Sequence, residues 1–500
     1  MQMLLSPEYQ LLISLVKSEI WPEENPGKDN CILDTSQICK QITDLQAEGW
    51  AILFEQAARQ GLLAIVWDAL DKLHAGPGYT EMTTRLSVAE HQEMTKLRIR
   101  WALSIKKIEG VHNRQWMVLK ELAGIFAESG MRVMVLKGLG LAQMYPRPEH
   151  RECGDLDIYL SGNSDNFARG NGFARGNGFR KDARIWNGPG FEKRNSFGKG
   201  TSFGKEAVFG MEDYFELGNK LIRSMRIPVE YDGSKHSKFY YKGIPVENHK
   251  NFLNVTYTQV DKNLECELVR ILQEQKCESL ELGGVSADIP PPDFQMIFLI
   301  RHAITHFLSS GIVLRHLYDL GIFYTAHAHE IDLERIEKIL MRESQYKLYR
   351  AFMDVLHIYL GMPEGVQEQQ QSATDGRLAE RVLADDIPDG HQRSKQDKRI
   401  NRLAERVLAD GTQDDLQRSK RDISKNRLAE RVLTDIIANP AGGKGKVKVE
   451  SMWVLMRKVV GAVRLFKFRW KYKLVEKNAF GNRFWRAIGN CFGNLYYSTL

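Results

Sequence analysis

Two aspartates with a spacing suited to metal binding, Asp155 and Asp157, lie in the segment Gly154-Asp155-Leu156-Asp157-Ile158-Tyr159-Leu160. In a β-strand, residues i and i+2 point to the same face, so we expect the two carboxylates to lie side by side above a buried apolar face. Adjacent carboxylates repel each other unless a cation lies between them or one takes a proton. Mg²⁺, which prefers oxygen ligands and leaves room for phosphates, suits this pair. Two unrelated acids at an exposed strand end would give the same pattern.

The residues just before this pair predict a site for phosphate. An apolar run over 131–136 predicts a strand, Lys137-Gly138 a turn, and 139–145 a short helix. A strand that turns at a glycine into a helix presents backbone N–H groups to an anion. Lys137 and Arg151 would add positive charge, and Arg151 could bind phosphate oxygens in bidentate fashion. The sequence therefore predicts phosphate binding by Lys137, Gly138 and Arg151 next to the two aspartates.

The run Leu136-Lys137-Gly138, Tyr145, Pro148, Arg151 and Gly154-Asp155-x-Asp157 resembles the uncharacterised bacterial nucleotidyltransferase family of the polymerase-β-like superfamily. That superfamily places a glycine-containing turn before a D-x-D strand and takes a third carboxylate from a later strand. One departure is the turn itself, which is commonly Gly-Ser or Gly-Gly in the superfamily and is Gly138-Leu139-Gly140 here.

The resemblance implies that Glu247 is the third carboxylate, because the family usually has an acid two residues before a histidine, as Glu247 and His249 are. Asp155, Asp157 and Glu247 would then be both the catalytic residues and the ligands of Mg²⁺. The implied co-substrate is an NTP, with ATP as the expected one. The match covers roughly residues 60–325.

A later stretch, with His302, His306 and Arg315-x-x-x-Asp319, resembles the helical half of the same family. His302 and His306 are four residues apart on one helix face, which is a spacing used by metal ligands. No glutamate lies between them as in H-E-x-x-H, so we favour a buried polar face near the nucleotide over a zinc site. Arg315 and Asp319 are expected to pair at i, i+4.

Composition is that of an ordinary large globular protein. Its 500 residues are 43% hydrophobic and 27% charged, with a formal net charge of +7. So mild a charge suggests a basic patch but not a dedicated nucleic-acid binder. The six cysteines form no C-x-x-C pair, which argues for reduced thiols in a cytosol and against a disulfide scaffold. We find neither a signal peptide nor an apolar run long enough to cross a bilayer, and expect a cytoplasmic protein.

We predict an α+β fold, in which a small mixed β-sheet nucleotidyltransferase core is embedded in a large, mainly helical protein. The expected parts are an N-terminal helical region (1–130), the core (131–255, with a low-complexity insertion at 161–211), a helical domain (256–370), charged tandem repeats of 25 residues (371–445) and a basic aromatic tail (446–500). The Gly-, Asn- and Phe-rich copies in the insertion bury too little side chain to form a core. We therefore favour a tolerated loop insertion over a loop that binds nucleic acid.

The repeats are three copies of Arg-Leu-Ala-Glu-Arg-Val-Leu-(Ala/Thr)-Asp, which begin at Arg377, Arg402 and Arg427. Their narrow apolar stripe leads us to interpret them as a duplicated charged helical spacer rather than a stacked solenoid. The tail interleaves basic and aromatic residues from 451 to 485. It could lie on an anionic membrane surface or on nucleic acid, or dock its aromatic side on the body of the protein.

The function expected from the sequence is Mg²⁺-dependent transfer of a nucleoside monophosphate from an NTP to an unidentified hydroxyl-type acceptor, which is a small molecule, a glycan or a protein. The main alternative is a catalytically inactive nucleotide-binding or interaction protein that retains the fold. A third is a scaffold that associates with RNA or with a membrane, peripherally, through the insertion and the tail.

Overall fold

A computed structural model describes residues 5–21, 35–45, 47–74, 87–162, 214–232, 235–256, 258–309, 311–363, 427–438, 469–472 and 474–475. The fold is α+β, as predicted: one mixed sheet of seven strands is surrounded by helices. The insertion at 161–211, apart from its first two residues, and the first two repeat copies lie outside the described residues. None of the described helices has the length and apolar content needed to cross a membrane.

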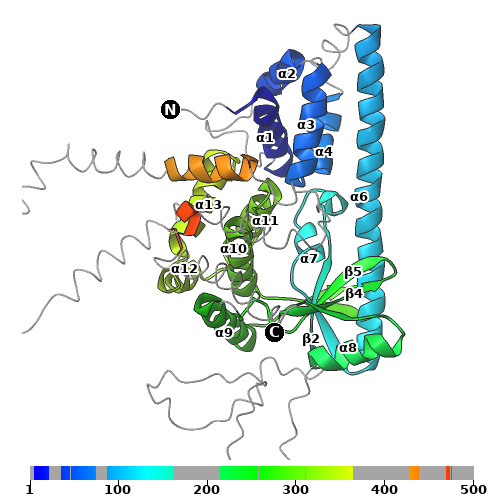
Figure 1. Cartoon of the computed structure of the whole chain (residues 1–500), viewed down its shortest axis with the longest axis vertical. Coiled ribbons are helices and arrows are strands. Elements are labelled where there is room, and N and C mark those ends of the chain that lie inside the picture. The colour runs from blue at the N-terminus through cyan, green and yellow to red at the C-terminus, as the bar shows by residue number, and fades with distance from the viewer. Residues whose placement is uncertain are drawn as a thin grey trace, which may run out of the picture.

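The helical elements are α1 (Pro7–Ile20), α2 (Thr35–Asp44), α3 (Ala47–Gln60), α4 (Leu63–His74), α6 (Val88–Glu128), α7 (Leu139–Ala142), η1 (Pro148–His150), α8 (Tyr214–Ser224), α9 (Gln259–Glu274), α10 (Pro292–Leu308), α11 (Leu314–Ala326), α12 (Leu333–Arg342), α13 (Tyr346–Ile358) and α18 (Arg469–Tyr472). The longest, α6, begins with a capping box of Ser87 and Glu90, which satisfies backbone N–H groups at its start. In Figure 1, α6 runs along one side of the molecule from the N-terminal helices to the sheet. It therefore connects the two regions.

The strands are β1 (Met131–Val135), β2 (Leu156–Gly162), β3 (Glu230–Asp232), β4 (His236–Tyr241), β5 (Ile244–His249), β6 (Glu278–Glu281) and β7 (Ser286–Ile289), in the order β3-β4-β5-β2-β1-β7-β6. β2 pairs with β5 in parallel and with β1 antiparallel. A tight turn at Lys242 and Gly243, both with positive φ, joins β4 to β5. The centre of the sheet is thus β2, with the predicted acid pair at its start.

The two faces of the sheet pack on different hydrophobic clusters. Alternate residues of β1 and β2, such as Val133, Val135 and Ile158, pack with the end of α6 and with α8. Met134 and Leu136 belong instead to a larger cluster that joins α1–α4 with α10–α13. Because this larger cluster is continuous, the N-terminal helical region and the later helical domain share one core.

Two expectations about local structure were wrong. The helix after the Lys137-Gly138 turn is a single turn, α7, and does not extend to Tyr145. We also expected residues 256–370 to be helical, whereas 278–281 and 286–289 form strands β6 and β7, which pair with each other, and β7 lies parallel to β1. The cause is a hairpin turn at Gly283 and Gly284, whose positive φ angles of 72° and 97° favour glycine.

The interpretation of the repeats as spacers was wrong for the third copy. Residues 427–438 form a helix whose Ala429, Val432, Leu433 and Ile436 are fully buried in the larger cluster. In Figure 1 this helix, in orange, lies across α13. Its apolar stripe is therefore part of the core of the protein.

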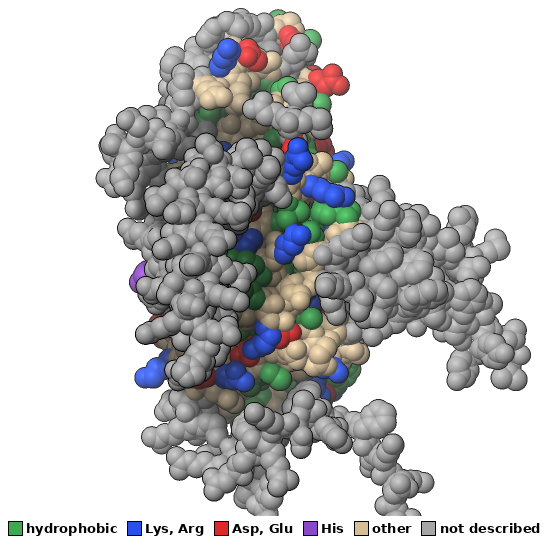
Figure 2. All heavy atoms as spheres, turned by 90° about the vertical axis from the view of Figure 1, so that its left-hand side faces the viewer, with side chains coloured by type: hydrophobic (Ala, Val, Ile, Leu, Met, Phe, Trp, Pro, Cys, Tyr) green, Lys and Arg blue, Asp and Glu red, His purple; other side chains and the backbone are tan. Residues whose placement is uncertain are grey.

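The part of the tail that the structure describes docks on this helix. Lys471 is buried, pairs with Asp435, and donates a hydrogen bond to the carbonyl of Phe307 at 3.1 Å. The Arg431 guanidinium lies 4.0 Å from the centre of the Trp470 ring. At 469–472 and 474–475 the tail thus contacts the protein body, while the rest of it lies outside the described residues. Figure 2 shows one face on which apolar, basic and acidic side chains are mixed, with several Lys and Arg along its middle.

Candidate active site

The three predicted carboxylates lie together at one edge of the sheet. Asp157 on β2 is the direct neighbour of Glu247 on the parallel strand β5, and Asp155 immediately precedes β2. One carboxylate oxygen from each of the three lies within 4.8 Å of the others. This is an arrangement of hard oxygen donors that suits Mg²⁺.

Asp157 is the buried centre of this group, with 1% of its surface exposed. His249 Nε2 lies 3.0 Å from Asp157 Oδ1, and Lys137 Nζ lies 3.2 Å from Oδ2. Burial disfavours the charged carboxylate, but Lys137 and His249 outweigh it and hold the pKa of Asp157 well below its usual range. Oδ2 contacts the Lys137 ammonium and accepts no other hydrogen bond from the described residues, so a buried lone pair remains for a divalent cation.

Glu247 differs from Asp157 in its protonation. Burial, followed by the charges of Asp157 and Asp155, raises the pKa of Glu247 to about 7. His236 Nε2 and Lys238 Nζ lie 3.5 and 3.7 Å from its oxygens. Glu247 is therefore a carboxyl group that exchanges a proton near neutral pH, which is suited to proton transfer.

A second lysine, Lys235, faces the carboxylates and was missed from the sequence. Burial and the charge of Lys137 lower the pKa of Lys235, while Asp157, Glu247 and Asp155 oppose the shift. A clue existed in the β4–β5 hairpin, which places His236 opposite His249. The residue before β4 must therefore lie beside the end of β5, where the acids are.

Gly138 and Lys137 form the turn between β1 and α7. Gly138 has φ +68° and ψ −105°, a conformation that side chains with a Cβ rarely adopt. No atom outside the turn comes closer than 3.7 Å to a Cβ built there, so the backbone angle, not space, requires glycine. The carboxylates of Asp157 and Asp155 outweigh the cost of burial and raise the pKa of Lys137, so that its ammonium group stays charged.

Arg151 does not have the free guanidinium that we expected for phosphate binding. It is 3% exposed, and its Nε and Nη2 donate to the two oxygens of Asp319 at 2.7 and 2.8 Å. Its Nη1 donates to the carbonyl of Gly138 at 3.2 Å and contacts Cys153 Sγ at 2.8 Å. The guanidinium therefore ties the glycine turn to α11. Arg315 pairs with Asp319 at 3.3 Å, as the i, i+4 spacing predicted.

Helices α10 and α11 form the opposite wall of the cleft in which these groups lie. The cleft has a volume of about 220 Å³ and is lined by Lys137, Gly138, Leu141, Arg151, Cys153, Gly154, Asp155, Asp157, Leu299, His302, Ala303, His306, Arg315, His316 and Asp319. His302 and His306 reach it together with His316, which the sequence did not single out. The groups of three potential ligands whose donor atoms converge in the described residues do not include these histidines.

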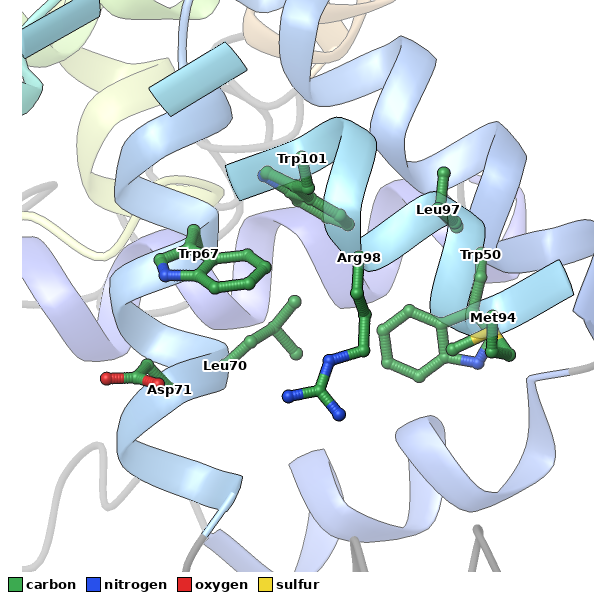
Figure 3. A pocket seen from close by; sticks show the side chains of 8 residues that line it. All are labelled: Trp50, Trp67, Leu70, Asp71, Met94, Leu97, Arg98 and Trp101. Atoms are coloured by element: carbon green, nitrogen blue, oxygen red, sulfur yellow. The ribbon is translucent and has the colours of Figure 1, made fainter. Parts of the chain in front are cut away.

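A different pocket lies among the N-terminal helices. It is lined mainly by apolar side chains, with Trp50, Trp67 and Trp101 around it and Arg98 reaching across, as Figure 3 shows. The centres of the Trp67 and Trp101 rings are 6.0 Å apart. Its lining includes a single carboxylate, Asp71, so it offers no comparable metal site.

Comparison with known proteins gives one result for this chain. Residues 46–361, more than half of the chain, match a family described as uncharacterised nucleotidyltransferase. No curated protein and no solved structure matches. The matched segment contains the three carboxylates, the glycine turn and both walls of the cleft. The chain therefore belongs to the uncharacterised nucleotidyltransferase family, and is a nucleotidyltransferase.

Proposed function

We propose that the protein transfers a nucleoside monophosphate from an Mg²⁺-bound NTP, with ATP as the first candidate, to a hydroxyl-type acceptor. The observation that carries this proposal is the convergence of Asp155, Asp157 and Glu247 from two adjacent strands. Family membership supports nucleotidyl transfer in general, and the convergence of the three carboxylates supports metal-dependent chemistry at this edge of the sheet.

The residues present fit a divalent cation. Asp157 keeps lone pairs beyond those that face His249 and Lys137, and Asp155 and Glu247 offer further oxygens beside it. When bound there, Mg²⁺ would neutralise charge on the triphosphate and polarise the α-phosphorus. Asp155 and Asp157 would hold it, with Glu247 completing the site.

The basic groups near the carboxylates would position the phosphates. Lys137 and Lys235 lie beside the carboxylates, and the Gly138 turn exposes backbone to the same space. Arg151 would act indirectly, because releasing its guanidinium to a phosphate requires breaking a buried ion pair with Asp319. We assign it the task of positioning the turn.

In the reaction, the acceptor oxygen forms a bond to the α-phosphorus while the bond to the β-phosphate oxygen breaks, and pyrophosphate leaves. The acceptor hydroxyl must lose its proton. Glu247 lies at the edge of the site, where its carboxylate would help to activate the acceptor by taking that proton.

The double variant Asp155→Asn/Asp157→Asn tests this function. Mg²⁺–ATP should stabilise wild-type protein against heat, by about 2.7 kcal/mol at about 100 times Kd, since a ligand of the folded state stabilises it by mass action. The double variant should lose this shift and should release no pyrophosphate. Glu93→Gln, at a side chain that is 68% exposed, is the control. An unchanged shift in the double variant would place the nucleotide elsewhere. A shift without pyrophosphate release, in a screen of hydroxyl acceptors, would favour the inactive nucleotide-binding alternative.

Our proposals for the acceptor, the location and the role of the tail are based on the sequence alone. We propose a small molecule, a glycan or a protein as acceptor, and a cytoplasmic protein that reaches anionic membranes or nucleic acid through basic residues of 446–500. Because Trp470 and Lys471 dock on the third repeat helix, that role would fall to other residues of the tail.

A further inference from the structure

The cleft has two chemically different walls. One carries Asp155 and Asp157 at the start of β2, and the other consists of His302 and His306 on α10 with His316 on α11. The acidic wall accounts for the metal and the acceptor in the proposed function. The proposed function assigns no role to the three histidines of the other wall.

The three imidazoles form one compact group. The ring centres of His302 and His306 are 4.4 Å apart, those of His302 and His316 5.7 Å, and those of His306 and His316 5.5 Å. Each side chain is half-buried and lines the cleft. His316 is fixed by the backbone N–H of Val313, which donates to its Nδ1 at 3.2 Å. A ring that accepts at Nδ1 has its proton on Nε2, which can donate to a ligand.

The charges around the wall favour an anion. Its two guanidinium groups, Arg151 and Arg315, share the single carboxylate of Asp319. Burial lowers the pKa of all three histidines, and Lys137 lowers each of them further. The imidazoles are therefore neutral donors held in a positive environment, where an anion would be stabilised.

From this geometry we infer that His302, His306 and His316 bind the β- and γ-phosphates of the nucleotide, and hold the pyrophosphate that leaves. The inference rests on the proposed function, which puts the α-phosphate at the carboxylates. Lys137 lies between the two walls, because its ammonium pairs with Asp157 and acts electrostatically on all three imidazoles. The triphosphate would thus run from the acids, past Lys137, to the histidines.

The competing occupant of this wall is the nucleobase, since imidazole rings can stack on a base. The two occupants differ in charge and can be separated by ligand fragments. Mg²⁺–pyrophosphate carries the charge without a base, and AMP carries the base with a single phosphate.

The experiment uses the full-length variants His302→Gln and His306→Gln, singly and together, with His329→Gln as the control at a side chain that is 80% exposed. Calorimetry measures Kd for Mg²⁺–pyrophosphate, Mg²⁺–ATP and AMP. Each cleft variant should raise the Kd for Mg²⁺–pyrophosphate and for Mg²⁺–ATP by about tenfold, the scale of one hydrogen bond to a charged group. The Kd for AMP should not change. Unchanged Kd values for pyrophosphate and ATP would overturn the inference. So would a loss for AMP as large as that for ATP with pyrophosphate unaffected.

If the variants fail to fold, a measurement on wild-type protein still tests the inference. Mg²⁺–pyrophosphate should shift the imidazole NMR resonances of the three cleft histidines and not that of His329, and unmoved resonances would contradict the inference. Failure of the histidine inference can be distinguished from failure of the proposed function. If Asp155→Asn/Asp157→Asn abolishes Mg²⁺–ATP binding and the histidine variants bind normally, only the histidine assignment falls. If wild-type protein binds neither ATP nor pyrophosphate, both fall.

Discussion

Asp157 and Asp319 are two buried aspartates of the same cleft with different tasks. Both are almost inaccessible, with 1% and 4% exposed surface, and each pairs with a basic side chain. Asp319 accepts from Arg151 at both oxygens, from Tyr145 at 2.8 Å and from Arg315 at 3.3 Å. Asp157 has His249 at one oxygen and Lys137 at the other, and two further carboxylates lie beside it.

Burial and ion pairing therefore do not separate a functional carboxylate from a structural one. What distinguishes the two is how many lone pairs of the carboxylate remain after its hydrogen bonds and ion pairs within the protein are counted. Asp319 has none to spare, and its neighbours are guanidinium and hydroxyl donors. Asp157 has lone pairs left next to two other carboxylates, and a divalent cation bound there would reduce their repulsion beyond what Lys137 does.

The largest effect expected is on stability, from Asp319→Asn. The substitution leaves two buried guanidinium groups without their carboxylate, so the free energy of unfolding should fall by about 3–5 kcal/mol. Urea unfolding measures it. Glu334→Gln, which removes a carboxylate from a surface ion pair with Lys338, should cost less than about 0.5 kcal/mol. A similar small cost for both variants would mean that the Asp319 network contributes little.

Glu247→Gln tests the other side of the comparison, through turnover. The change removes a negative charge at nearly constant size, so pyrophosphate release should fall on the order of 100-fold. Mg²⁺–ATP binding should weaken only modestly, because Asp155 and Asp157 remain.

Glu265→Gln is the matched control for this variant. Burial raises the pKa of Glu265 to about 7 as well, but its oxygens accept the backbone N–H groups of Phe252 and Leu253 at 3.0 and 2.8 Å. Its substitution should leave turnover nearly unchanged. If Glu247→Gln turned over like wild type, strand β5 would be structural and the site would have two carboxylates.

The two carboxyl groups should also differ in their response to pH. Glu247, with a pKa of about 7, must lose a proton to bind a cation, whereas Asp319, at about 2, stays ionised. Mg²⁺ affinity should therefore fall by up to about tenfold for each pH unit below about 7, and Glu247→Gln should flatten this dependence. In metal-free protein the sign for stability is opposite. Because the pKa of Glu247 is raised on folding, its contribution is present below 4.5 and is lost as pH rises through about 7. Calorimetric Mg²⁺ titrations and thermal melts across this range measure both.

Local pattern was enough to predict the acid strand, the glycine turn and the helical regions. Asp155, Asp157 and the opposite apolar face depend only on strand alternation, and Glu247 was reached by family resemblance. The role of Arg151 was missed because its partner Asp319 is 168 residues away in the chain. A pair so far apart in the chain leaves no pattern in the local sequence. The sequence around an arginine near a turn is the same whether its guanidinium is free or buried.

The third repeat copy was misread for a related reason. The three copies share the motif, but the residue after its final aspartate is Ile436 in the third copy, where the others have Asp386 and Gly411. Ile436 is fully buried. A helix with a narrow apolar stripe can join the core when one more apolar residue widens the stripe and the fold offers a groove that the helix can fill. The sequence does not show that groove.

The smallest effect expected is that of Tyr145→Phe, which tests whether Asp319 is saturated. The Tyr145 hydroxyl donates to Asp319 Oδ1 at 2.8 Å, and its removal leaves three donors on that carboxylate. The free energy of unfolding should fall by about 1 kcal/mol, with turnover nearly unchanged. The control is Tyr318→Phe on α11, because the buried hydroxyl of Tyr318 has no hydrogen-bond partner within the described part of the chain. That variant should be neutral or slightly stabilising. A large drop in turnover for Tyr145→Phe, with stability unchanged, would instead give Asp319 and its neighbours a direct part in catalysis.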